Sequence, residues 1–203
     1  MTPQPARAEE VFLVRHGETE WSLSGQHTGF TDLPLTENGH HAAKRLEPLL
    51  SGLEFALVLS SPLRRARQTC ELAGLGDRVL IDPDLAEWDY GQYEGLTSDQ
   101  IHRTAPGWTI FRDGAPGGES PTQVGARVDR LIGRVLAVAG RVALFGHGHL
   151  FRVFAARWIG LAPMHGAHFT LDPSTLCILG YYKGTPALRR WNCPTDSILM
   201  ELR

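Results

Sequence analysis

The chain has 203 residues, 42% of them hydrophobic and 21% charged, with a formal net charge of −2 at pH 7. This length supports one good-sized core and predicts a single domain over residues 1–203. The charge gives no basic field for nucleic acid, and no Lys/Arg run indicates a membrane surface. The polar first ten residues contain no apolar signal segment, and no stretch reaches transmembrane length, so we expect a cytoplasmic protein. The three cysteines have no CxxC spacing and predict neither a disulfide framework nor a zinc site.

The first predicted element is a strand over Val11-Phe12-Leu13-Val14, four apolar residues that suit a strand buried on both faces. It ends in Arg15-His16-Gly17, and open α/β sheets bind ligands at the carboxyl ends of their strands. We expect Gly17 to let the backbone turn sharply or approach a ligand closely. The Arg-His pair by itself indicates no more than a polar loop.

Residues 20–35 are predicted to form a long, ordered and functional loop, anchored by Trp21, Phe30 and Leu33. A helix capped by Thr36 follows, and Pro48 is expected to kink or restart it near Glu47.

Residues 55–59 form the second predicted strand, which leads directly into Ser60-Ser61-Pro62. Ser61 as N-cap and Pro62 at the first helical position predict the start of a helix. Its apolar stripe would consist of Leu63, Ala66, Cys70 and Ala73. Residues 79–81 then form a short third strand.

Residues 84–118 are irregular and are predicted to form an insertion over one end of the sheet, with a short helix near 98–103. Ser120-Pro121-Thr122-Gln123 is typical of a capping box and begins a helix. A buried strand at 141–145 ends in Gly146-His147-Gly148-His149. A helix at 150–159 and a closing hairpin that turns at Lys183-Gly184 complete the chain.

Strands that alternate with helices predict an α/β layer sandwich. Three polar groups directly follow buried strands: Arg15-His16, the segment 61–65 and His147. If these strands are parallel, the groups meet at one edge of the sheet.

Such a cluster suits phosphate chemistry. Arginine donates paired hydrogen bonds to phosphate oxygens and remains charged. A histidine kept neutral by neighbouring cations, with a carbonyl accepting from one ring nitrogen, can attack phosphorus with the other. Glu87, followed by Trp88, would supply the proton for the leaving group from a partly apolar setting.

Five blocks of sequence extend this pattern. They are residues 13–19, residues 61–69, Leu85-Ala86-Glu87 with Tyr90-Gly91 and Glu94-Gly95, Gly117-Gly118-Glu119-Ser120, and Gly146-His147-Gly148. Together and in this order they resemble the histidine phosphatase superfamily, the phosphoglycerate-mutase-like family, over nearly the whole chain. The resemblance implies a three-layer α/β/α sandwich with a mostly parallel mixed sheet and no cofactor. It also implies His16 as nucleophile, Glu87 as proton donor, and Arg15, Arg65 and His147 as phosphate ligands, with Arg65 rather than Arg64 at the family position.

The family contains both mutases and phosphatases. Mutase-like members carry a lysine after the Glu-Gly block and a paired-arginine segment beyond it, and this chain has neither between residues 96 and 118. We therefore expect hydrolysis of a small phosphorylated metabolite, such as a sugar phosphate, or a broad-range acid phosphatase, with phosphoglycerate mutase as the alternative. By position, Thr28, Gly29 and Gly148 would contact substrate, and Ser22 replaces a common family Asn, with a looser reach to the phosphate.

Two other classes of function stay open. A metallohydrolase would use His147 and His149 with His16 and Asp89, although this set is short of ligands at metal spacing. A binding module that lacks activity would need neither His16 nor Glu87. His27, His149 and His165 are expected to be ordinary polar residues, with His149 the best candidate for the pocket. Arg103, Arg112 and the 20–35 loop are the candidates to meet a second phosphate. An edge strand or the closing hairpin is a candidate surface for a homodimer.

Overall fold

The computed structural model describes residues 8–195, which contain a six-stranded sheet in the order β3-β2-β4-β1-β5-β6. The strands β3, β2, β4 and β1 pair in parallel, whereas β5 runs antiparallel to β1 and forms a hairpin with β6. The α/β class and the mostly parallel mixed sheet predicted from the sequence are confirmed. The strands are β1 (Ala8–Arg15), β2 (Leu57–Ser60), β3 (Val79–Ile81), β4 (Gly140–Gly146), β5 (Thr175–Tyr182) and β6 (Thr185–Pro194).

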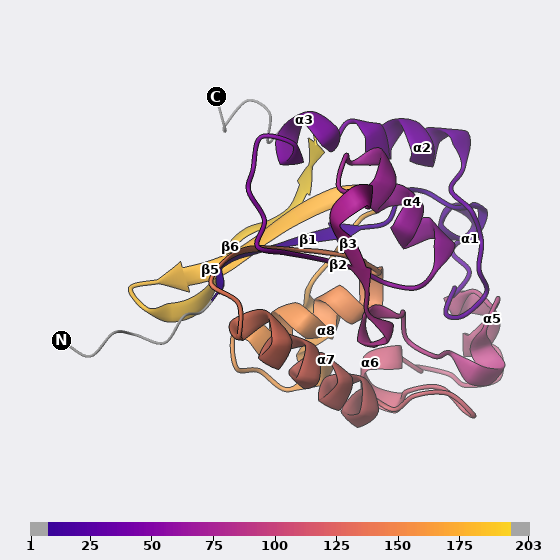
Figure 1. The fold of residues 1–203 in the computed structure, drawn as a ribbon. Coiled ribbons are helices and arrows are strands. Elements are labelled where there is room, and N and C mark those ends of the chain that lie inside the picture. Colours follow the sequence, from indigo (N-terminus) through magenta and orange to yellow (C-terminus); the bar gives the residue numbers. More distant parts are fainter. Residues whose placement is uncertain (1–7, 196–203) are drawn as a thin grey trace.

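Helices cover both faces of this sheet. Figure 1 shows α2 (Glu37–Lys44), α3 (Glu47–Leu50) and α4 (Arg64–Leu72) on one side, and α7 (Pro121–Leu136) and α8 (Gly148–Trp158) on the other. The side chains of β1 alternate between two cores: Val11 and Leu13 join the core under α7 and α8, and Phe12 and Val14 join the core under α3 and α4. The apolar run at 11–14 therefore marks a strand buried on both faces, as its composition predicts.

Two of the helix starts predicted from local sequence occur as expected. The Thr36 hydroxyl accepts from the Gly39 N–H at 3.0 Å, and a separate helix, α3, restarts with Pro48 in its first turn. Ser120 and Gln123 form the capping box of α7, with Pro121 at the first position. These predictions are confirmed because each depends on residues within one helical turn.

The predicted start of α4 is wrong. The helix begins at Arg64 with Leu63 as its N-cap residue, two residues later than the Ser61-Pro62 pair indicates. The Ser61 hydroxyl lies 2.7 Å from the His147 ring and accepts from the Leu63 N–H at 3.2 Å. His147, which is distant in sequence, thus bonds to the hydroxyl oxygen that Ser61 would need to act as an N-cap.

The segment 20–35 is not one continuous loop. It opens with α1 (Glu20–Ser24), which is capped by Thr19 through a reciprocal bond with Ser22. Phe30 is 57% exposed and does not anchor the segment. The predicted apolar anchors are partly replaced by backbone contacts with the 84–118 segment, where Gln26 bridges Thr97 and the His27 N–H donates to the Leu96 carbonyl.

Residues 84–118 contain short elements only. Figure 1 shows α5 (Ser98–His102) at the end of the molecule where α1 follows β1, and α6 (Ile110–Asp113) nearby. Four 3₁₀ helices are also present among the described residues: η1 (Gly76–Arg78), η2 (Pro83–Leu85), η3 (Gly91–Tyr93) and the longer η4 (Pro163–His168). Among the described residues, no helix has the length and apolar character needed to cross a membrane.

The turn after β1 packs tightly against α2. A Cβ atom at Gly17 would lie 2.7 Å from the Gly39 carbonyl oxygen, and one at Gly39 would lie 2.3 Å from the Glu18 carbonyl oxygen. The close approach that Gly17 permits is therefore to the backbone of α2.

We predict that Gly39→Ala destabilises the protein by about 1–3 kcal/mol, because backbone atoms must move to admit the methyl group. Gly133→Ala in α7 is the matched control. A Cβ there would meet nothing within 4 Å, so better helix propensity should add up to about 1 kcal/mol. Urea unfolding of both variants measures the difference, and equal stability of Gly39→Ala and wild type would contradict the packing.

Candidate active site

The polar groups predicted to meet at the strand ends surround a pocket of about 280 Å³. Its walls come from β1, α1 and the loop after it, the 84–118 segment and α8. The lining residues are Arg15, His16, Trp21, Ser22, Gly25, Gln26, His27, Thr28, Glu87, Tyr90, Ser98, Gly148, His149, Arg152 and Leu171. A second depression, of about 430 Å³ and beside α2 and β6, contains none of the predicted catalytic side chains.

His16 is 5% exposed, and its position is fixed by both backbone and side chain. Its N–H donates to the Gly146 carbonyl of β4 at 2.9 Å, and its Nδ1 lies 2.7 Å from the Gly17 carbonyl oxygen. Because a carbonyl only accepts, Nδ1 carries the proton of the neutral ring and Nε2 presents a lone pair. Burial, followed by the charges of Arg65 and Arg15, lowers the pKa of His16 well below 6.5.

Arg65 lies fully buried beside this histidine. Its guanidinium donates to the carbonyl oxygens of Thr28, Gly29 and Thr31 at 2.9–3.0 Å, and its Nε donates to His147 Nδ1 at 3.2 Å. Arg64, by contrast, is exposed. The structure therefore places Arg65 and not Arg64 in the cluster.

His147 bonds through both ring nitrogens. Its Nδ1 accepts from Arg65, so in the neutral ring Nε2 carries the proton and donates to the Ser61 hydroxyl at 2.7 Å. Its ring centroid lies 5.2 Å from that of His16. Burial, followed by the charge of Arg65, lowers the pKa of His147 well below 6.5.

Arg15 reaches across the pocket to the Leu171 carbonyl through Nη1. Its buried Nε has no hydrogen-bond partner among the described residues and is a donor available to a ligand. A Cβ at Gly148 would lie 3.2 Å from the Arg15 Nε and Cζ atoms, so the glycine at this position makes room for the guanidinium.

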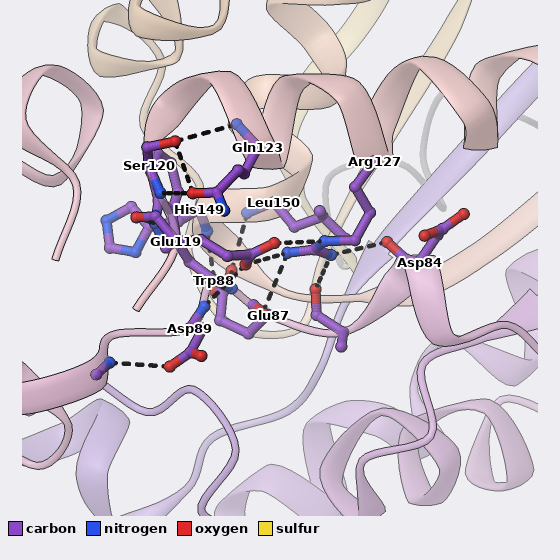
Figure 2. A network of polar contacts seen from close by, with 12 residues as sticks. Asp84, Glu87, Trp88, Asp89, Glu119, Ser120, Gln123, Arg127, His149 and Leu150 are labelled. Atoms are coloured by element: carbon purple, nitrogen blue, oxygen red, sulfur yellow. Dashed lines mark hydrogen bonds and ion pairs between the residues drawn. The ribbon is translucent and has the colours of Figure 1, made fainter. Parts of the chain in front are cut away.

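Glu87 points at the amino end of α8. Its Oε1 accepts from the N–H groups of Trp88 and Leu150, each at 2.9 Å, and its Oε2 accepts from the His149 N–H at 3.0 Å (Figure 2). The surroundings are thus richer in donors than the apolar setting expected from Trp88, and a helix N-terminus holds the carboxyl group in place.

A partly buried ion pair supports the segment that carries Glu87. Arg127 of α7 donates to both carboxylate oxygens of Glu119, at 3.0 and 2.7 Å, and to the carbonyls of Asp84 and Ala86 (Figure 2). Glu119 in turn accepts from the Asp89 N–H at 3.0 Å. Arg127 was not among the residues predicted from the sequence. Its only local signal is a charged residue between Val124 and Val128 on the buried face of α7.

The predicted substrate contacts divide into two groups. Ser22 and Thr28 line the pocket, although the Ser22 hydroxyl already serves the cap of α1. Gly29 is outside the lining: its N–H donates to Glu94 and its carbonyl accepts from Arg65. Gly29 therefore positions the arginine.

Several pocket residues received little or no weight from the sequence, among them Arg152 and His27. Arg152 lies one helical turn after Gly148 on α8, a spacing that places both on one face. His27 and His149 were expected to be ordinary polar residues, with His149 the best candidate for the pocket. Both line the pocket, and His149 Nδ1 lies 2.5 Å from the Tyr90 hydroxyl. The position of His27 depends on how the 20–35 segment lies against the strand ends, which no local pattern encodes.

Within residues 8–195, no group of three or more His, Cys, Asp or Glu side chains is arranged to hold a metal ion. His147 is committed to Arg65 and Ser61, and the Asp89 carboxylate accepts from the Gly91 N–H at 2.9 Å. The geometry gives no support to the predicted metallohydrolase set.

Comparisons with known proteins identify the family of this chain. The family model of the histidine phosphatase superfamily (branch 1) matches residues 11–194. An acid phosphatase of Mycobacterium tuberculosis is 40% identical over 186 residues, 90% of this chain and 91% of that protein. A sedoheptulose 1,7-bisphosphatase of Saccharomyces cerevisiae is 39% identical over 189 residues, 77% of this chain and 70% of that protein.

Two further matches are a mutase and a solved structure. A 2,3-bisphosphoglycerate-dependent phosphoglycerate mutase of Mesorhizobium japonicum is 38% identical over 134 residues, 58% of this chain and 64% of that protein. The solved structure of an open reading frame product of Mycobacterium tuberculosis superposes with a TM-score of 0.87 at 36% identity, covering 92% of this chain and 98% of that chain. The mutase match is thus less extensive than the phosphatase matches.

The lowered histidine pKa values predict acid sensitivity of the fold. Between pH 7 and 5 the unfolded chain gains protons near its histidine pKa of about 6.5, whereas His16 and His147 remain neutral in the folded state. The unfolded state then binds more protons, so the free energy of unfolding falls as the pH falls, by up to about 1.4 kcal/mol per pH unit for each such histidine.

Urea unfolding at pH 7, 6 and 5 measures this slope. We expect His147→Gln to reduce it by about one proton, and His41→Gln, at an exposed position on α2, to leave it unchanged. A slope that is the same in all three proteins would show that His147 is protonated when folded.

Proposed function

The chain belongs to the histidine phosphatase superfamily, and we propose that it hydrolyses small phosphomonoesters through a phosphohistidine formed on His16. The observation that carries this proposal is the unprotonated Nε2 of a buried, neutral His16 with two arginine side chains beside it. A phosphoryl group carries about −1.5 to −2 charge at neutral pH and would complete this cationic cluster.

The first step forms the intermediate. The phosphoryl oxygens receive hydrogen bonds from the free Arg15 Nε and from the first N–H of α8, at Gly148, and the Arg65 charge and the His147 ring lie beside them. His16 Nε2 attacks phosphorus, a P–N bond forms and the ester P–O bond breaks. The Glu87 carboxyl group donates its proton to the departing alkoxide.

The second step regenerates the enzyme. Glu87, now a carboxylate, accepts a proton from a water molecule that attacks phosphorus from the side vacated by the alcohol. The P–N bond breaks, inorganic phosphate leaves and His16 returns to its neutral form. The bond from Nδ1 to Gly17 keeps the same tautomer through both steps.

For the substrate class we propose sugar phosphates or a broader range of phosphate esters. The relatives that cover most of the chain are an acid phosphatase and a sedoheptulose bisphosphatase, which supports this choice over phosphoglycerate mutase. Both the nucleophile and the carboxyl group are present, so the alternative of an inactive binding module gains no support.

We also propose that residues 1–203 form one histidine-phosphatase-like domain, with residues 84–118 as an insertion over the active site. The contacts of that segment with residues 26 and 27, and the presence of Glu87, Tyr90 and Ser98 in the pocket lining, support this division. The cytoplasmic location and the homodimer stay predictions from the sequence.

Loss of the nucleophile tests the mechanism. We predict that His16→Ala lowers phosphate release from p-nitrophenyl phosphate in excess EDTA by roughly 10³-fold or more. His41→Ala, on the exposed face of α2, is the matched control and should retain wild-type activity. Wild-type protein should also carry acid-labile, base-stable phosphate after rapid quenching.

Activity that needs added metal, or that survives His16→Ala, would overturn the mechanism. The same preparations are assayed for conversion of 3-phosphoglycerate to 2-phosphoglycerate. Conversion well above the rate of phosphate release would favour the mutase instead.

The proposed role of Glu87 as proton donor predicts a dependence on the leaving group. Glu87→Gln keeps the shape of the side chain but has no proton to give, so hydrolysis of an alkyl phosphate should fall by about 10²–10⁴-fold. p-Nitrophenyl phosphate has a leaving group that needs no proton, so formation of the intermediate from it should fall far less. Burst kinetics with both substrates measure this step, and an equal loss with both would assign Glu87 a structural role.

A further inference from the structure

Glu94 is a carboxylate of the 84–118 segment that the proposed mechanism does not use. Its Oε1 accepts from the N–H groups of Gly29 and Thr31 at 2.9 and 3.0 Å, and its Oε2 lies 2.9 Å from the same Gly29 nitrogen. Among residues 8–195, the hydrogen bonds of this carboxylate all come from main-chain N–H groups. The side chain is partly buried and outside the pocket lining, so it is not placed to contact substrate.

The loop that Glu94 binds is also the loop that holds Arg65. The guanidinium donates to the carbonyl oxygens of Thr28, Gly29 and Thr31. The link is direct at one peptide group, because the Thr28 carbonyl and the Gly29 N–H belong to the same unit. This unit is trans, so its oxygen and its hydrogen point to opposite sides, the oxygen toward Arg65 and the hydrogen toward Glu94.

The shared peptide group therefore lies between a cation and an anion in the orientation that both favour. Hydrogen bonds to charged groups are stronger than neutral ones, and hydrogen bonds in a chain polarise one another. Burial lowers the pKa of Arg65, whereas the charge of Glu87 and, more weakly, of groups that include Glu94 raise it. Glu94 thus offsets part of the cost of burying the Arg65 charge, through the intervening peptide group.

The absence of a side chain at Gly29 makes this close approach possible. A Cβ atom there would lie 2.6 Å from Glu94 Oε2 and 2.7 Å from the Trp88 carbonyl oxygen. The backbone of residues 28–31 is thus held between the carboxylate and the guanidinium. The four bonds that Arg65 makes among the described residues leave one N–H, on Nη1, available to a ligand, so the position of this loop decides where that donor points.

We propose that Glu94 is a positioning residue for Arg65: through the peptide group that both bond, it orients the guanidinium toward the phosphoryl group. This inference rests on the proposed function, since it assigns a support to the same site. The 84–118 segment then carries two carboxylates with different tasks, because Glu87 serves the leaving group and Glu94 serves a phosphoryl ligand. Loss of Glu94 should accordingly affect all phosphomonoesters alike.

The first test removes the charge and keeps the shape of the side chain. In Glu94→Gln we expect kcat/KM for p-nitrophenyl phosphate to fall about 5- to 50-fold and the inhibition constant of inorganic phosphate to rise. The fall should be equal for glycerol 3-phosphate, because both esters present the same phosphoryl group to Arg65. Glu87→Gln, in contrast, should distinguish the two leaving groups.

A double-mutant cycle shows whether Glu94 acts through the arginine. Arg65→Gln alone should lower kcat/KM more than Glu94→Gln does, and the double variant should lose no more than about twofold beyond Arg65→Gln. Gly29→Ala, whose methyl group must displace the carboxylate, should reproduce the loss seen in Glu94→Gln. It takes the place of Glu94→Gln in the cycle if that variant fails to fold.

Asp113→Asn is the matched control. Asp113 lies in the same segment and also accepts a main-chain N–H, that of Thr109 at 2.8 Å. Its bonds among the described residues are with Thr109 and Arg112, and none is with residues 28–31. Arg112, like Arg103, is exposed and outside the pocket lining, so neither arginine is placed to meet a second phosphate as the sequence suggested. The control variant should keep the wild-type kcat/KM within about twofold.

The outcomes separate the positioning role from the reaction. A wild-type kcat/KM in Glu94→Gln, additive losses in the cycle, or a loss confined to one leaving group would overturn the role of Glu94 and leave the phosphatase intact. No release of phosphate from either ester by the wild-type protein would instead overturn the proposed function.

Discussion

The site depends on the buried positive charge of Arg65, which forms no ion pair with a carboxylate among residues 8–195. Arg65 is fully buried and bonds to three carbonyl oxygens of residues 28–31 and to His147. Those bonds use four of its five N–H groups and involve no carboxylate oxygen, so the cluster favours an anion. The same charge helps keep His16 and His147 neutral. One residue thus attracts the phosphoryl group and preserves the lone pair proposed to attack it.

The groups around Arg65 are positioned by different elements of the fold. The parallel register of β1 and β4 brings the His16 N–H to the Gly146 carbonyl, and His147 directly follows β4. Helix α8 presents N–H groups to Glu87, while α7 supplies Arg127 to hold the segment that carries it. The proposed nucleophile and proton donor are therefore positioned by separate contacts, and a local change in one need not displace the other.

The groups proposed for phosphoryl transfer and the outer wall of the pocket come from different elements. The strand ends and the amino end of α8 hold the groups proposed for phosphoryl transfer, whereas α1, the loop after it and residues 84–118 form the outer wall. That wall is made of short elements joined by main-chain contacts such as His27 to Leu96. Insertions and substitutions in such segments disturb the sheet little, so the outer wall can vary among relatives with different substrates.

The sequence by itself determined the α/β class, the strands buried on both faces, the caps at Thr36 and Ser120, and the identities of His16, Arg65, Glu87 and His147 as candidates. These follow from local periodicity, from short-range capping and from the resemblance to a family. Only the tertiary structure decided the late start of α4, the position of Gly29 behind Arg65, the support of Glu87 by Arg127 and the presence of Arg152 in the pocket. Each of these depends on contacts between residues more than 30 positions apart or on the way that segments fold over the strand ends. Spacing along the chain carries no record of such contacts, because they arise only when the layers pack.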